Sequence, residues 1–251
     1  MTHPSISPAV VAAFCPTGKL RASINLGNPI LANRDPATGE PVGISIDLAR
    51  AFGERLGVET EWLVFDKAVQ SVTAVRNEQA DIGFFAIDPA RSEGLRFTAP
   101  YVLIEGSYLV PQPSALQDNE AVDHAGVRIG VASGSAYDLF LTREIKSAAI
   151  ERLLKAEDVV EALLGGRVEV AAGIRQMLES VAAGSQGALR LLPGRFMVIQ
   201  QAMGTPASRG DEAAALLSSF VEEMKASGFV ADSMKRHGIQ GATVAPAGAV
   251  A

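Results

Sequence analysis

The sequence predicts an α/β protein of two lobes, each a mainly parallel sheet flanked by helices, with two crossover strands joining them. Three observations lead to this prediction. From residue 19 onward, short apolar runs alternate with segments of helical period. A polar stretch at 111–126 interrupts the alternation, and a second series of strands and helices follows it. The long apolar segments 101–110 and 196–202 predict the strands by which the chain passes into a second lobe and returns.

The first lobe begins with a short helix at Pro8, for which Ser7 is the expected cap. The elements expected next are a strand at 20–24, a turn at 35–40, a helix at 47–56 ended by Gly57, a strand at 60–65, a helix at 68–77 and a strand at 80–85. This β-α-β-α-β order is typical of an open, mainly parallel sheet, because a crossover helix must join parallel neighbours.

The second lobe repeats the alternation, and the chain then returns to the first. The expected elements are strands at 127–132, 149–153, 168–172 and 189–192, and helices at 136–145, 157–164 and 174–183. Gly204-Thr205-Pro206 predicts a turn after the return strand, and Gly228 separates two final helices at 210–226 and 228–237. The predicted domains are therefore residues 1–109 with 197–251 and residues 110–196. We expect 240–251 to be a disordered tail.

Composition excludes several classes of function. The 251 residues are 48% hydrophobic and 20% charged, with a net charge of −6, which argues against a nucleic-acid partner. Cys15 is the single cysteine, and the three histidines stand far apart, so the sequence offers no metal site. No apolar run approaches the roughly 18 residues of a membrane span. No nucleophile motif or glycine-rich phosphate loop appears, so we expect no catalytic residue and no cofactor.

The segment from Gly83 to Arg91 is the most informative part of the chain. An apolar strand runs into the turn Asp88-Pro89, and Arg91 then falls in the first turn of a helix. Backbone N–H groups at a helix start and one guanidinium together suit a carboxylate. A solvated surface arginine after an ordinary connection is the alternative interpretation.

Several segments, in this order and spacing, resemble the type 2 periplasmic solute-binding proteins, which deliver amino acids and related polar solutes to ABC importers. The resemblance covers about residues 18–239. Its segments are Gly18-Lys19-Leu20-Arg21, Gly43-Ile44-Ser45-Ile46-Asp47-Leu48-Ala49, Ala80-Asp81-Ile82-Gly83, Asp88-Pro89-Ala90-Arg91, Phe97-Thr98-Ala99-Pro100-Tyr101, Val127-Arg128-Ile129-Gly130-Val131, Ser133-Gly134-Ser135 and Met224-Lys225-Ala226-Ser227-Gly228-Phe229.

In the first lobe, the resemblance implies that Arg91 binds the α-carboxylate of a ligand and that the backbone N–H near Ala86 makes a second contact. Asp88 occupies the helix cap where the family usually has Thr or Ser. An aspartate caps equally well, but its charge opposes an anion.

In the second lobe, the resemblance implies that Ser133, Ser135 and the N–H of Ala136 meet the ligand at a helix start. Ordinary helix capping is the alternative for the two serines, and both roles can coexist.

The chain departs from the family after its first strand. The family usually has an aromatic ring there, whereas this loop carries Asn25 and Asn28. Their amides offer hydrogen bonds to a ligand, or they are simply turn residues. Phe65, Trp62 and Phe84 are the rings that could replace the missing one, and each also suits the core.

A second departure concerns the ligand's ammonium group. Ile174 stands at the position of the family's acidic residue, and Arg175 follows it. A buried ammonium without a carboxylate partner costs several kcal/mol. If Arg91 and Arg175 both face the ligand, an organic anion is favoured over an α-amino acid. Glu105 is the nearest substitute acid, and Arg175 could instead face solvent.

These observations favour binding of a small carboxylate-bearing or amino-acid-like solute in a cleft between the lobes, with hinge closure, as the substrate-binding component of an ABC importer. The expected partner is an ABC permease, and the expected state is a monomer. One alternative is a lyase of the cyclohexadienyl dehydratase type, with Glu105 or Glu169 as general acid. Another is a cytoplasmic ligand sensor or scavenger, because no signal peptide is visible although the family is normally periplasmic.

Overall fold

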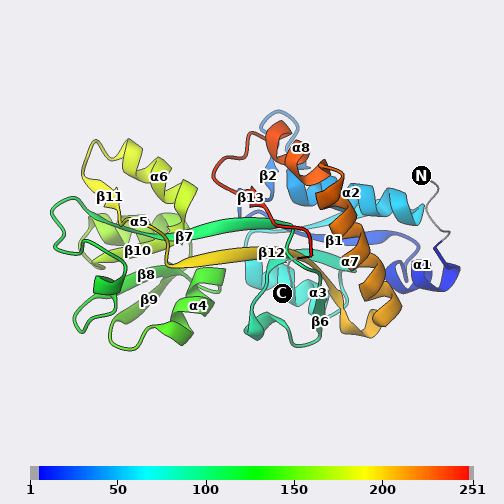
Figure 1. The fold of residues 1–251 in the computed structure, drawn as a ribbon, viewed down its shortest axis with the longest axis horizontal. Coiled ribbons are helices and arrows are strands. Elements are labelled where there is room, and N and C mark those ends of the chain that lie inside the picture. Colours follow the sequence, from blue (N-terminus) through cyan, green and yellow to red (C-terminus); the bar gives the residue numbers. More distant parts are fainter. Residues whose placement is uncertain (1–5, 249–251) are drawn as a thin grey trace. The chain divides into compact units, whose positions relative to one another are not determined.

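The computed structural model describes residues 6–248, which form two compact units (Figure 1). Within these residues, unit 1 comprises 6–103 and 200–248, and unit 2 comprises 104–199. The chain passes from unit 1 to unit 2 within β7 (Val102–Pro111) and returns within β12 (Met197–Pro206). The predicted fold class, two α/β lobes joined by two strands, is confirmed.

The sheet of unit 1 has β1 at its centre, with parallel neighbours on both sides. Its order is β4 (Thr60–Phe65), β1 (Leu20–Asn25), β5 (Ile82–Ala86) and β12, the last antiparallel to β5. The helices α2 (Ile44–Leu56) and α3 (Ala68–Arg76) lie on opposite faces, because their right-handed crossovers run in opposite directions across the sheet (Figure 1). The predicted β-α-β-α-β order is therefore confirmed, and Gly57 ends α2 with φ 73° as expected.

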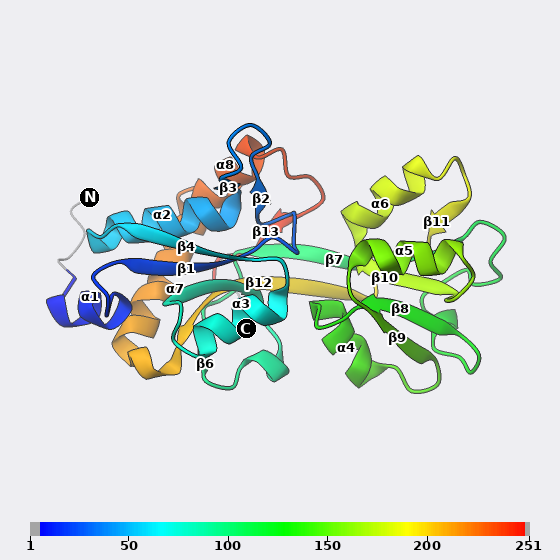
Figure 2. The same ribbon diagram turned by 180° about the vertical axis from the view of Figure 1, so that it is seen from behind.

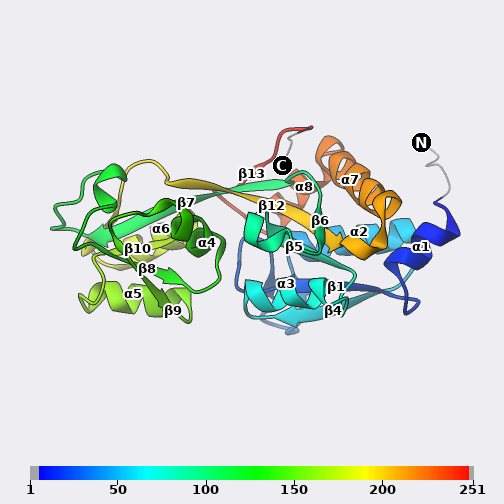
Figure 3. The ribbon, with the colours of Figure 1, turned by 90° about the horizontal axis from the view of Figure 1, so that it is seen from below.

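Three further helices cover the α2 face of unit 1, as Figure 3 shows: α1 (Pro8–Phe14), α7 (Asp211–Ala226) and α8 (Phe229–Arg236). Ser7 caps α1, accepting a hydrogen bond from the Val10 N–H at 3.3 Å, as predicted. A chain of rings ties the layer together, with Phe14 5.0 Å and Phe220 4.9 Å from Phe52, measured between ring centroids.

The predicted turn at Gly204-Thr205-Pro206 is wrong, because these residues continue β12. They pair with β6 (Leu95–Phe97) in antiparallel register, and Gly204 also pairs with Gly83 of β5. Pairing on both sides of the strand overrides the local turn preference of glycine and proline. Pro206 is the last strand residue, where a missing N–H is tolerated. A short hairpin of β2 (Asn33–Arg34) and β3 (Pro41–Val42) encloses the predicted turn at 35–40.

The prediction of a disordered tail is wrong for 240–248, and 249–251 lie outside the described residues. β13 (Thr243–Val244) pairs with the start of β7, and the Ala245 N–H donates to the Tyr101 carbonyl at 3.0 Å. The buried ammonium of Lys225 donates to the Pro246 carbonyl at 3.0 Å. Backbone pairing and this buried cation order a segment whose small-residue composition predicts disorder.

Unit 2 has the sheet order β7, β10 (Val170–Ile174), β8 (Arg128–Ala132) and β9 (Ala149–Leu153), with β11 (Leu189–Leu191) also on β7. Strands β10, β8 and β9 are parallel, and β7 is antiparallel to β10. The helices are α4 (Ala136–Glu144), α5 (Ala156–Leu164) and α6 (Arg175–Gly184), of which α5 and α6 lie side by side (Figure 2). β10 begins two residues later than predicted, so Ile174 is its last residue.

Candidate functional site

In unit 1, the strand β5 delivers the chain to a one-turn 3₁₀ helix, η1 (Pro89–Arg91). Asp88 is its cap, and its carboxylate accepts a hydrogen bond from the Ala90 N–H at 2.9 Å. The Ser92 hydroxyl donates to the Asp88 carbonyl at 3.1 Å. The predicted capping role of Asp88 is confirmed, and these contacts hold the backbone that carries Arg91.

Arg91 is buried, with 6% of its surface exposed, so the surface-arginine alternative is excluded. Its Nη1 donates to the Ala86 carbonyl at 3.3 Å, which turns the side chain back towards the end of β5. Burial lowers the pKa of Arg91 to about 10, although the nearby Asp88 charge acts in the opposite direction. Arg91 therefore remains a cation at neutral pH, in surroundings that stabilise its charge less than water does.

The backbone of Ala86 is oriented by the pairing of β5 with β12. The Ile87 N–H donates to the Gln200 carbonyl at 2.8 Å, and Ala86 is opposite Gln201. Groups alternate along an antiparallel pair, so the N–H and C=O of Ala86 point away from β12. The carbonyl meets Arg91, and the N–H lies on the same side of the strand. Arg91 and Ala86 thus come together as the resemblance implies, while their contact with a ligand stays a prediction.

Asn25 and Asn28 are turn residues in unit 1. The Asn25 Oδ1 accepts from the Gly27 N–H at 3.0 Å, and the Asn28 Oδ1 accepts from the Ile30 N–H at 3.2 Å. Both are side-chain turns that reach two residues ahead. Their oxygens are thus used within the loop, and a ligand contact through either amide stays a prediction.

The aromatic residues considered for the missing ring have different surroundings. Phe65 ends β4 opposite Asn25 and packs, partly buried, against the cluster that contains Val72 and Phe85. Phe84 is buried, with its ring edge-on to Tyr101 at 6.3 Å between centroids. Phe84 therefore belongs to the core. Phe65 is only partly buried at the strand end and stays a candidate.

In unit 2, the turn between β8 and α4 holds the two candidate serines. The Ser135 hydroxyl caps α4, accepting from the Asp138 N–H at 3.1 Å, and the Asp138 carboxylate accepts from the Gly134 N–H at 2.8 Å. Ser133 is exposed, and its N–H donates to the Leu153 carbonyl. Capping by Ser135 is confirmed. Ligand contacts from Ser133, Ser135 and the N–H of Ala136, the first residue of α4, stay predictions.

The Arg175 guanidinium is already in contact with other groups of unit 2. Its Nε lies 2.7 Å from a Glu105 oxygen, as an ion pair rather than a directed hydrogen bond, and its Nη1 is 3.5 Å from Glu179. Its Nη2 donates to the Gly194 carbonyl. Ile174 is buried at the end of β10 and caps α6 without a side-chain hydrogen bond. The sequence favours an organic anion over an α-amino acid only if Arg91 and Arg175 both face the ligand. The contacts of Arg175 within unit 2 do not support this condition.

The Glu105 carboxylate is also already paired, with two arginines. Arg195 Nη1 donates to its carboxylate at 2.5 Å, and Arg175 flanks the other oxygen. Arg195 first and Arg175 second lower the pKa of Glu105 below its usual range, although partial burial opposes them. Glu105 is therefore an ionised partner of two arginines. As a substitute acid for an ammonium ligand, it would have to give up these contacts.

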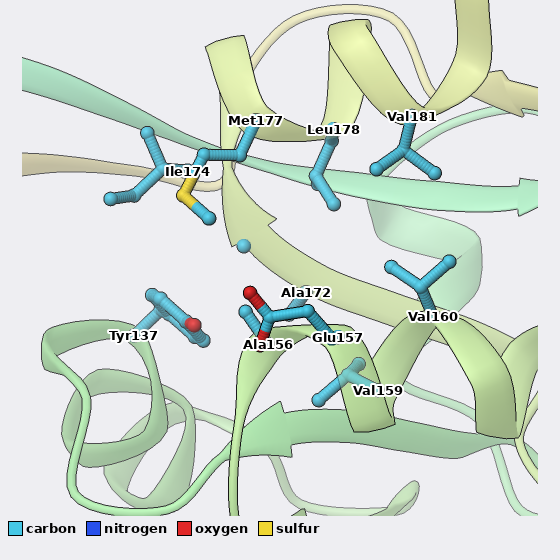
Figure 4. Close-up of a pocket in the computed structure, with 11 residues that line it drawn as sticks. Tyr137, Ala156, Glu157, Val159, Val160, Ala172, Ile174, Met177, Leu178 and Val181 are labelled. Carbon is cyan, nitrogen blue, oxygen red and sulfur yellow. The ribbon is translucent and has the colours of Figure 1, made fainter. Parts of the chain in front are cut away.

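A pocket in unit 2 was missed by the sequence reasoning (Figure 4). It opens between α5 and α6 over the last residues of β10, and its volume is about 90 Å³. Its side chains are nearly all apolar, apart from Glu157 and the Tyr137 hydroxyl. They belong to Tyr137, Ala156, Glu157, Val159, Val160, Ala172, Ile174, Met177, Leu178 and Val181. The apolar spacing in each helix is visible in the sequence, but the gap between two helices is not.

The part of the chain that the structure describes contains neither a metal site nor a membrane-spanning helix. Within 6–248, no group of three metal-ligating side chains is close enough to hold an ion, and no helix is long and apolar enough to cross a membrane. Cys15 is a buried free thiol, whose pKa burial raises to about 11. His3 lies outside the described residues.

Residues 27–239 match the family model of the bacterial extracellular solute-binding proteins, family 3. The chain belongs to this family. Among solved structures, it is similar to the binding component of an ABC transporter from Wolinella succinogenes complexed with lysine, with TM-score 0.74, 19% identity and coverage of 88% of this chain and 95% of that one.

Two further structures of the same fold are similar. An amino acid ABC transporter substrate-binding protein from Streptococcus pneumoniae bound to L-arginine has TM-score 0.74, 18% identity and coverage of 90% and 96%. An ancestral amino acid-binding protein, a precursor of cyclohexadienyl dehydratase, has TM-score 0.71, 19% identity and coverage of 90% and 98%. At these identities the likeness establishes the fold. The roles that the resemblance implies for Arg91 and Ile174 stay predictions.

Proposed function

We propose that this family 3 protein binds a small solute through a carboxylate group, as the substrate-binding component of an ABC importer. The observation that carries the proposal is the environment of Arg91. A buried guanidinium whose pKa is lowered by desolvation gains more from an anion than a solvated one does. The Ala86 N–H, on the same side of β5, adds a second donor for a carboxylate oxygen.

We propose α-amino acids with a cationic side chain as poorer ligands. Ile174 offers no charge to an ammonium group, and Glu105 is held by two arginines. The lysine and arginine bound by the similar structures belong to those proteins. A thermal-shift screen of organic acids against neutral and cationic amino acids tests this choice. Larger shifts with the acids support the proposal, and a clear preference for arginine or lysine contradicts it.

The states of the Glu105 and Glu169 carboxyl groups favour solute binding without catalysis. A general acid needs a pKa near the working pH. Arg195 and Arg175 lower the pKa of Glu105, and a hydrogen bond from Arg128 lowers the pKa of Glu169. Both residues are therefore ionised at neutral pH, which disfavours the lyase alternative.

Three finer points stay predictions, each with its own measurement. Hinge closure predicts a smaller radius of gyration in small-angle scattering when ligand is added. A monomer predicts a mass near 26.2 kDa by light scattering. A role in import predicts that deleting the gene from its source organism abolishes uptake of the labelled ligand. A sensor or scavenger would leave uptake unchanged.

A further inference from the structure

The pocket between α5 and α6 is built by unit 2 alone. Ala172, Gly173 and Ile174, the last three residues of β10, form one of its walls, and α4, α5 and α6 supply the other lining residues. All of the lining residues fall within 104–199. A group that fills the pocket is therefore recognised by the side chains of unit 2.

The interior of this pocket suits hydrocarbon rather than water. Figure 4 shows Met177, Leu178 and Val181 of α6 facing Val159 and Val160 of α5 across the space. A buried water needs two to four polar partners, which these side chains do not supply. An aliphatic group gains free energy on entering such a space, because it leaves water for apolar contacts.

The size of the pocket limits its occupant. Its volume of about 90 Å³ is below the roughly 150 Å³ of an apolar cavity that accepts benzene. A Cβ at Gly173 would stand 3.2 Å from the Leu178 side chain, so this wall is already close-packed and does not readily widen. A branched aliphatic group of about four carbons is the largest group in keeping with this space.

The Glu157 carboxylate gives this apolar space one charged edge. Glu157 is exposed in the first turn of α5, and it is the one charged side chain among the described residues that line the pocket. Figure 4 shows its carboxylate on the side of the pocket where Tyr137 lies. Within 6–248, no hydrogen bond or ion pair engages this carboxylate. Its charge is thus available to a group that enters the pocket.

The surroundings of Tyr137 show which sign of charge this edge favours. Burial raises the pKa of Tyr137 to about 12, the charges of Asp138 and Glu157 act in the same direction, and the Ser135 hydrogen bond opposes them. Asp138 is paired with Arg152, whose Nε lies 3.0 Å from its carboxylate. An ammonium group at this edge would be attracted by Glu157, and an anionic group would be repelled.

We propose that this pocket is a second ligand site, which binds short branched alkylammonium ions. The ammonium group pairs with Glu157, and the branched chain lies between α5 and α6. The inference goes beyond the proposed carboxylate binding and involves no residue of the Arg91 site, so either can fail without the other. Each CH₂ group moved from water into the pocket tightens binding about fourfold. An ion pair at an exposed edge adds about two- to fivefold.

A methyl NMR titration of the full chain at pH 7 tests the inference, with 2-methylpropan-1-amine, methylamine and 2-methylpropan-1-ol as probes. Both amines are cations at this pH, as a lysine side chain is. We expect the branched amine to bind about 60-fold more tightly than methylamine, because it has three extra carbons. It should bind about two- to fivefold more tightly than the alcohol, which has the same shape and no charge.

The methyl signal of Met177, assigned with Met177→Leu, reports whether the probe is in the pocket. The branched amine should shift this signal along the same titration curve that gives its affinity. An unmoved Met177 signal at saturating amine, or equal affinities for the two amines, would overturn the inference.

Two charge variants on α5 test the ion pair. Glu157→Gln keeps the shape of the side chain and removes its charge. Glu161→Gln removes the same charge one turn further along the helix, at a residue that does not line the pocket. The preference for the amine over the alcohol should disappear in Glu157→Gln and persist in Glu161→Gln. An unchanged preference in Glu157→Gln contradicts the proposed ammonium contact.

Two further variants on α5 separate pocket filling from a general effect. Val160→Phe fills the pocket, and Leu164→Phe adds a ring at a position that does not line it, where Leu164 is 61% exposed. The preference for the branched amine over methylamine should fall to about threefold or less in Val160→Phe and persist in Leu164→Phe. Should Val160→Phe fail to fold, Val181→Phe fills the pocket from α6. A full preference in the folded filling variant would place the amine elsewhere and refute the inference.

Discussion

Arg91 in unit 1 and Arg175 in unit 2 both follow the end of a buried strand, and both occupy positions at which a ligand contact is predicted. Their surroundings differ. Arg91 is buried against the carbonyl of Ala86, and desolvation lowers its pKa. Arg175 is partly exposed and meets two carboxylates, Glu105 and Glu179, and a backbone carbonyl. Carboxylates within unit 2 thus pair with Arg175, whereas burial is the largest influence on the pKa of Arg91 and the Asp88 charge acts in the opposite direction.

Residue type and position are therefore insufficient evidence for an anion site. An arginine that is already paired with carboxylates gains little from another anion and must first lose a partner. A buried arginine whose pKa is lowered by desolvation is stabilised by a bound anion, because the anion's charge replaces the stabilisation that water gives to an exposed guanidinium. The proposed carboxylate recognition therefore rests on Arg91 of unit 1 and not on Arg175 of unit 2.

The largest expected effect separates the two arginines directly. Arg91→Ala should weaken carboxylate binding by about 30-fold to several thousand-fold, because truncating a buried charged partner costs about 2–5 kcal/mol. Arg175→Ala should change it by less than about threefold. Calorimetry with the acid that gives the largest thermal shift measures both variants, and Arg91→Ala should keep the melting temperature nearly unchanged. Equal losses of carboxylate affinity in the two variants would show that the two arginines do not differ in their contribution to binding.

The second prediction concerns pH. Arg91 has a pKa lowered to about 10 in the free protein, so it is protonated at pH 6–9 and becomes neutral above about pH 10. Carboxylate affinity should be flat from pH 6 to 9 and then fall, approaching tenfold per pH unit above pH 10. Calorimetry from pH 6 to 10.5 measures this. A midpoint of the loss near pH 7 would point to a different group.

The third prediction concerns the charge beside Arg91. Asp88→Ser keeps a capping oxygen and removes the negative charge, so it should tighten carboxylate binding about fivefold, from about 1 kcal/mol of repulsion. Asp88→Ala also removes the cap and should destabilise the fold by about 1 kcal/mol. Calorimetry and urea unfolding read the two effects separately. Weaker binding by the serine variant would show that Asp88 itself contacts the ligand.

The smallest expected effect lies in the Arg175 network. Glu105→Gln should destabilise the protein by about 1 kcal/mol in urea unfolding, and a double-mutant cycle with Arg175→Ala should give a coupling of about 0.5–1 kcal/mol. Because the pKa of Glu105 is lowered in the folded state, this contribution is present at neutral pH. It is lost as the pH falls through the folded-state pKa. Purely additive effects would show that the ion pair does not stabilise unit 2.

Local patterns predicted most of the elements of both units, because apolar period and cap residues act within a few positions. The failures arise from distant partners. Gly204 is in a strand because Gly83 and Phe97 pair with it, and Ala245 is ordered by a hydrogen bond to Tyr101. The residues next to Gly204 and Ala245 in the sequence do not indicate these contacts.

The same limit applies to the site. The Asp88 cap and the place of Arg91 follow from a motif of a few residues, so the sequence predicted both. The partner of Arg175 is Glu105, which is 70 residues away in the sequence, and the pocket needs the spacing between α5 and α6. Neither an ion pair nor a gap of this kind can be derived from one chain segment alone.

The central claim is that the ligand is bound through its carboxylate. Calorimetry of the acid with the largest thermal shift, alongside its primary amide, tests this most directly, because the two compounds differ in charge and hardly in shape. The account predicts that the amide binds to the wild-type protein at least about 30-fold more weakly, the lower limit expected for loss of a buried charge partner. An amide that binds as tightly as the acid would contradict it.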